Sequence, residues 1–79
     1  MEIQQTKRAE LLTKKSVEKD KVIFRHIGSR KILAFIGQNS CGYFYAFGSP
    51  SQSGGYIAFN TKGYEEAESK IYEHLSPML

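Results

Sequence analysis

The chain has 79 residues, of which 41% are hydrophobic, 24% charged and 13% aromatic. This length provides one hydrophobic core, so we expect one small globular domain over residues 1–79, and the average composition excludes disordered and collagen-like chains. No apolar run exceeds five residues and the first residues lack an apolar signal core, which predicts a cytoplasmic protein without a membrane segment. The single cysteine, Cys41, cannot form an internal disulfide, in keeping with a reducing compartment.

The positive charge is concentrated in the first part of the chain. The net charge is +3, but residues 1–31 carry nine Lys or Arg against four acidic residues, while residues 32–79 carry two against four. A basic segment of this kind attracts phosphate groups or an acidic protein surface. The same charges also suit a solvated flank that keeps a small protein in solution.

Residues 1–20 are predicted to form a polar, basic helical segment. They are rich in Lys, Glu and Gln, and residues 2–20 contain no Gly or Pro. Their apolar stripe is thin, with Leu11 and Leu12 at its centre, so this helix either docks on the rest of the domain or stays frayed until a partner arrives.

From residue 21 the apolar pattern changes to a two-residue period with β-branched and aromatic side chains, which indicates strands. We expect antiparallel strands over residues 21–60, at 21–27, 31–36, 43–47 and 55–60. Every connection is too short for a crossover helix, which excludes parallel neighbours and predicts an up-and-down meander.

Residues 61–76 are predicted to form a C-terminal helix. Its apolar stripe consists of Tyr64, Ala67, Ile71 and Leu75. Asn60 or Thr61 is the expected N-cap, and Pro77 ends the helix because the residue before a proline avoids the helical region. The predicted fold class is therefore α+β: a four-stranded antiparallel meander sheet with the C-terminal helix packed on one face and a polar, basic N-terminal helix.

Alternation within the strands sorts their side chains into two faces. The apolar set comprises Phe44, Ile57 and Phe59, with either Leu33 and Phe35 or Ile32 and Ile36. We expect this set to form the core and to receive Ile71 and Leu75 of the helix. The opposite face then carries Tyr43, Tyr45 and Tyr56, which suit base stacking or protein adhesion unless the N-terminal helix covers them.

The residue types that carry catalysis or bind metals show no useful spacing. Cys41 has no visible base nearby, and two isolated histidines, His26 and His74, do not make a metal motif. The Gly- and Ser-rich loop at 48–55 lacks the ending of a phosphate-binding loop and leads into a strand. We therefore expect no enzymatic activity, no cofactor, no metal and no small-molecule substrate.

Two binding functions fit the sequence. The first is a nucleic-acid-binding accessory module, in which cations contact phosphates while tyrosines stack on bases. The second is a protein-binding inhibitor or adaptor, of the sort that mobile elements encode, or a homodimerising subunit that uses the same aromatic face. The candidate binding residues for either partner are Lys14, Lys15, Arg25, Arg30, Lys31, Tyr43, Tyr45 and Tyr56.

The relative position of the cations and the tyrosines discriminates between these functions. Nucleic acid is favoured if the basic residues share a face with Tyr43, Tyr45 and Tyr56, and a protein partner is favoured if they lie apart. Arg25 is informative because its orientation fixes that of the whole first strand.

Overall fold

The computed structural model describes residues 9–78, and their fold is α+β, as predicted. Residues 9–12 are helical and lead directly into the first strand. The following elements are β1 (Thr13–Glu18), β2 (Lys21–His26), β3 (Ile32–Asn39), β4 (Gly42–Phe47), β5 (Phe59–Thr61), α2 (Tyr64–Leu75) and the short 3-10 helix η1 (Ser76–Met78).

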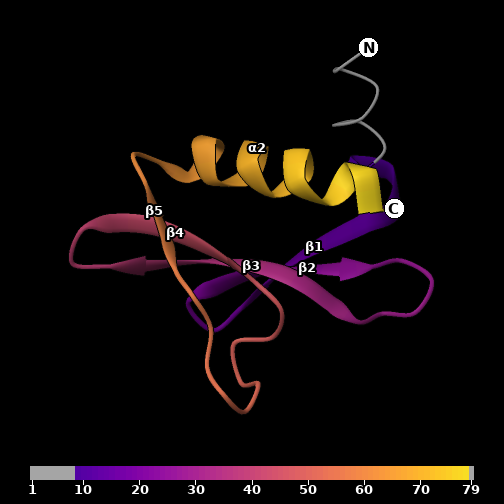
Figure 1. Cartoon of the computed structure of the whole chain (residues 1–79), viewed down its shortest axis with the longest axis horizontal. Helices are drawn as coiled ribbons and strands as arrows, with labels where there is room; N and C mark the ends of the chain where they lie inside the picture. The colour runs from indigo at the N-terminus through magenta and orange to yellow at the C-terminus, as the bar shows by residue number, and fades with distance from the viewer. Residues whose placement is uncertain (1–8, 79) are drawn as a thin grey trace.

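The strands form one antiparallel meander in the order β1-β2-β3-β4-β5. Helix α2 lies across one face of this sheet, while the long connection between β4 and β5 lies on the other side (Figure 1). We call the face opposite α2 the open face. The meander is confirmed, with five strands in place of four, and the last strand is shorter than the predicted 55–60.

The prediction of a helix through residue 20 is wrong at its C-terminal half, because residues 13–18 form the edge strand β1. These residues alternate between the two faces, and β1 pairs along its whole length with β2, from Thr13 opposite His26 to Glu18 opposite Lys21. The intervening turn has Lys19 in the left-handed region at φ 59°. Pairing with a neighbouring strand thus overrides the helical propensity of the lysine- and glutamate-rich sequence. Residues 1–8 of the predicted helical segment lie outside the residues that the structure describes.

The core beneath α2 is built from alternate residues of the central strands. Its buried members are Ala9, Phe24, Ala34, Ile36, Ala67, Ile71, Tyr72 and Leu75. The ring of Phe24 meets that of Tyr72 edge-on, with 5.6 Å between centroids. The predicted stripe of α2 therefore faces the sheet as expected.

A second, smaller core lies on the open face. It consists of Ile23, Phe35, Phe44 and Ala46, with Ile32 packed against it. Tyr56, from the connection between β4 and β5, covers this cluster. The centroid of its ring lies 4.8 Å from that of Phe35 and 6.0 Å from that of Phe44. A long loop, and not a helix, thus buries this set of apolar side chains.

The predicted assignment of the two faces is therefore wrong. Tyr43 and Tyr45 pack against the α2 side of the sheet, whereas Phe44 belongs to the open face. Phe59, predicted to be core, is 43% exposed and stacks on Tyr45, and Ile57 is 74% exposed in the loop. A register shift opposite Phe24 and Arg25 also breaks the alternation of β3, so neither predicted pair of β3 residues faces one way.

The C-terminal end of α2 is tied to the beginning of the described chain. The backbone N–H of Ala9 donates to the Oγ of buried Ser76 at 3.3 Å, and Thr13 Oγ1 donates to the carbonyl of Ala9 at 2.6 Å. Helix α2 ends at Leu75, just before the predicted stop at Ser76 and Pro77. The predicted start at residue 61 is wrong, because α2 begins at Tyr64 and its N-cap is Gly63, not Asn60 or Thr61. Among residues 9–78, no helix has the length and apolar character needed to cross a bilayer.

Candidate functional site

A basic cleft lies on the open face at the edge formed by β1 and β2. Lys14 of β1 is directly opposite Arg25 of β2, and the turn after β2 contributes Arg30. The cleft has a volume of about 500 Å³. Its lining residues are Lys14, Ser16, Arg25, His26, Ile27 and Arg30. The strand pairing thus brings together three of the eight candidate residues predicted from the sequence.

The turn that carries Arg30 is held by the imidazole of His26. The Nδ1 atom of His26 accepts hydrogen bonds from the backbone N–H groups of Gly28 at 3.0 Å and Ser29 at 3.3 Å. The backbone N–H of Arg30 donates to the carbonyl of His26 at 2.8 Å, and Arg30 has a positive φ of 65°. His26 therefore positions the turn, a role that the sequence analysis did not assign to it.

Arg25 lines the cleft and is paired with Glu18. Its guanidinium donates to both carboxylate oxygens of Glu18, at 3.2 and 2.9 Å, and this contact lowers the pKa of Glu18. Within residues 9–78, no ion pair involves Lys14 or Arg30. These two cations line the same cleft as Arg25 and are available to an incoming anion.

A second hollow continues the cleft along the open face. It has a volume of about 420 Å³ and shares Arg25 with the basic cleft. Its lining also includes the segment from Ser49 to Ser51, the apolar side chains of Ile23 and Ile32, and the carboxylates of Glu18 and Asp20. The two hollows together suit an extended ligand that crosses the strands.

The two layers of the molecule carry opposite charge. Residues 13–31, which form β1, β2 and the turns that follow them, contain seven basic and two acidic residues, a net charge of +5. Helix α2 contains Glu65, Glu66, Glu68 and Glu73 but only one lysine, Lys70. An anion is therefore attracted to the sheet edge and repelled from the helix.

The other candidate residues lie elsewhere. Lys15 points to the α2 side and forms an ion pair with Glu68, while Lys31 is exposed in the turn after β2. Tyr43 and Tyr45 are half-buried beside α2. Tyr56 is the one predicted tyrosine over the open face, where 40% of its surface remains exposed.

The contacts around Lys15 predict a loss of stability at alkaline pH. The hydrogen bond to Glu68 raises the pKa of Lys15, and burial raises the pKa values of Tyr64 and Tyr72. A pKa raised by folding stabilises the native state below the unfolded-state pKa, and this stabilisation is lost as the pH rises through the folded-state pKa. The free energy of unfolding, measured in urea, should therefore fall between about pH 10 and pH 12.

Tyr72→Phe is the matched variant for this effect because it keeps the ring but removes one titrating hydroxyl. Its free energy of unfolding should fall less steeply over the same pH interval. An unchanged stability of the wild-type chain between about pH 9 and pH 12 would contradict the interpretation.

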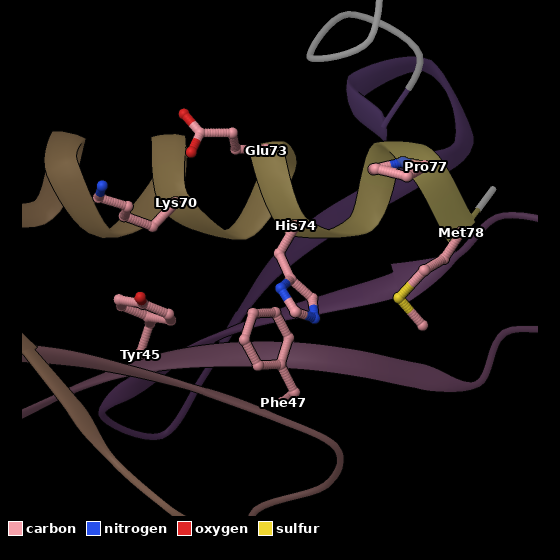
Figure 2. A pocket seen from close by; sticks show the side chains of 7 residues that line it. All are labelled: Tyr45, Phe47, Lys70, Glu73, His74, Pro77 and Met78. Atoms are coloured by element: carbon pink, nitrogen blue, oxygen red, sulfur yellow. The ribbon is translucent and has the colours of Figure 1, made fainter.

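A separate hollow lies between α2 and β4 (Figure 2). The rings of Phe47 and His74 face each other there, with 4.3 Å between centroids, and Tyr45 points up from the sheet beside them. The rim carries one cation, Lys70, and one anion, Glu73. This balance gives the hollow no preference for either sign of charge, so it is a weaker candidate site than the basic cleft.

Comparison with known proteins adds no assignment, since no protein-family model, curated protein or solved structure matches the chain. In the described part of the chain, no group of three or more His, Cys, Asp or Glu side chains is arranged to hold a metal ion. Cys41 is a free, exposed thiol in the turn between β3 and β4.

Sequence reasoning missed several residues of the cleft. Ser16, His26 and Ile27 became part of it only because residues 13–18 form a strand beside β2. The available signal was the β-branched and hydroxylated character of Thr13, Ser16 and Val17, which lowers helix propensity.

Proposed function

We propose that the protein is a non-catalytic, cytoplasmic binding module that takes nucleic acid on the open face of its sheet. The observation that carries this proposal is the clustering of Lys14, Arg25 and Arg30 around one cleft, on the face away from the acidic helix α2. Lys14 and Arg30 contact phosphates, and Arg25 donates from its fixed position on Glu18. Such contacts give affinity with little sequence selectivity.

The open face also offers a stacking contact. Tyr56 lies over Phe35 on the same face as the basic cleft, and part of its ring remains accessible. Stacking of this kind requires unpaired bases, because the faces of paired bases are already covered. A single strand that crosses the open face is thus the ligand that uses both features.

The salt dependence of binding tests this proposal. The protein is titrated into fluorescently labelled single-stranded and duplex oligonucleotides, and the anisotropy is measured at 50 and 200 mM salt. Three phosphate contacts should raise the dissociation constant by roughly 20- to 40-fold over this interval. The single strand should bind more tightly than the duplex.

Each alternative result has a definite meaning. A dissociation constant that is equal at both salt concentrations contradicts phosphate recognition. A folded sample that binds neither oligonucleotide contradicts the whole proposal and leaves a protein partner as the function to pursue.

A protein partner is the second candidate, and the position of two tyrosines favours it. Tyr43 and Tyr45 lie on the α2 side of the sheet, whereas the cations of the cleft lie on the open face. Exposed apolar side chains, such as Ile57, are the kind of contact on which protein association depends.

A further inference from the structure

Strand β5 is a sheet edge without the usual protection. Among residues 9–78 its one partner strand is β4, and residues 51–60 are all exposed. Residues 48–61 contain no charged side chain. Proteins commonly protect edge strands with charges, and the opposite edge, β1, is protected in this way by Lys14, Lys15 and Glu18.

The same edge carries exposed apolar side chains. Ile57 is 74% exposed, Phe59 43% and Tyr56 40%, and all three line a hollow of about 470 Å³. A cluster of large apolar side chains within four residues is unusual on the surface of a small protein and marks a surface that associates.

The strand-like sequence at β5 is longer than the strand itself. Residues 56–59 include three β-favouring side chains, Tyr56, Ile57 and Phe59, which predicts a strand, yet the ladder with β4 covers only Phe59–Thr61. Strands are typically about five or six residues long. Residues 56–58 thus continue the strand pattern of β5, but no other strand among residues 9–78 pairs with them.

We propose that two copies of this chain pair antiparallel through β5, with the new ladder extending over residues 56–60 and centred on Ala58, so that Ile57 of each copy lies opposite Phe59 of the other. Antiparallel pairing of identical strands has two-fold symmetry, so Ile57 and Phe59 of each copy pack against the other copy. The sheets join into one, and the open faces of both copies lie on the same side.

The charge distribution favours a second copy over an acidic or basic partner. The uncharged segment at residues 48–61 meets an identical uncharged segment, so no like charges oppose each other. The basic edge at β1 lies four strand positions away, which is about 19 Å at 4.8 Å per strand. This separation exceeds the screening length of about 8 Å at physiological salt.

Size-exclusion chromatography with light scattering tests the proposal, because it measures the molar mass of the protein as it elutes. The wild type is loaded at concentrations up to about 200 µM. The wild-type chain should approach twice its monomer mass of 9.0 kDa. Ile57→Lys, which places a charge opposite the apolar Phe59 of the other copy, should raise the dimer dissociation constant at least about 100-fold and give a monomer. The matched control is Val17→Lys, at an equally exposed position (76%) on the other edge, and it should remain dimeric.

Hydrogen exchange of the wild-type chain provides a reading that needs no variant. The backbone amides of residues 56–60 should exchange more slowly at high than at low protein concentration. A monomeric mass at every concentration overturns the proposal. A dimer that survives Ile57→Lys, or amides whose exchange is independent of concentration, also overturns it.

Discussion

Replacing Phe24 by alanine is expected to lower the free energy of unfolding by about 3–5 kcal/mol. The side chain is 0% exposed, lies opposite Ala34 in the sheet and meets Tyr72 of α2 edge-on. Small neighbours such as Ala34 cannot extend into the space that the ring leaves, so a cavity persists. A chain of this length has a total stability of roughly 4–12 kcal/mol, so the substitution should remove at least about a quarter of it.

Urea unfolding followed by far-ultraviolet circular dichroism measures this loss. Val17→Ala serves as the comparison, because Val17 is 76% exposed and its truncation should change the free energy by less than about 0.5 kcal/mol. A loss below about 1 kcal/mol for Phe24→Ala would show that the core beneath α2 is not the main source of stability.

The sheet and the last helix were predictable because local signals specify them. Two-residue alternation between Gly-containing turns identified β2, β3 and β4, and the apolar stripe that includes Ile71 identified α2. The short connections were enough to predict the order of the strands, since they allow only antiparallel neighbours.

Strand β1 was not predictable from the same signals. Its turn, at Lys19 and Asp20, contains no glycine, although Lys19 adopts a positive φ of 59° that glycine would favour. Its pattern of alternating side chains is also weak, because an edge strand needs charged residues on both faces. Only pairing with β2 reveals it, and pairing is a property of the tertiary structure.

The two faces were exchanged in the prediction for a related reason. Alternation separates Tyr43 and Tyr45 from Phe44, but it does not say which set the helix covers. The helix covers the tyrosines, which remain half-exposed, while Tyr56 and its loop bury Phe35 and Phe44. The assumption that the most apolar set must face the helix failed because a long loop buries side chains equally well.

The candidate site was also predictable only in part, because residue types are visible in the sequence whereas their positions depend on the tertiary structure. The sequence identified Lys14, Arg25 and Arg30 as cations, but not that they line one cleft, because Lys14 reaches Arg25 only through the pairing of β1 with β2. Their separation from Tyr43 and Tyr45 also depends on the strand faces. Their common face with Tyr56 depends on a loop that has no local signal for its path.

Reversing the charge of both free cations, in the double variant Lys14→Glu with Arg30→Glu, should weaken nucleic-acid binding at 50 mM salt by at least about 100-fold. Each charged contact to phosphate contributes about 1.5–3 kcal/mol, and the introduced carboxylates add repulsion. Both positions are exposed, and glutamate at position 30 meets the same backbone geometry as arginine. The fold should therefore persist, with an unchanged circular dichroism spectrum, while the anisotropy titration loses most of its salt dependence.

The matched control is Lys62→Glu with Lys70→Glu, which changes the net charge by the same amount at two exposed positions outside the cleft. If the cleft binds phosphate, this control should lose no more than about 5-fold in affinity, because neither lysine lines the cleft and exposed charges outside it are screened by salt. Equal losses in the two double variants would mean that total charge, and not the cleft, attracts the nucleic acid. A cleft variant that keeps its affinity would show that Lys14 and Arg30 make no contact with phosphate, and the binding surface would then have to be sought elsewhere on the sheet.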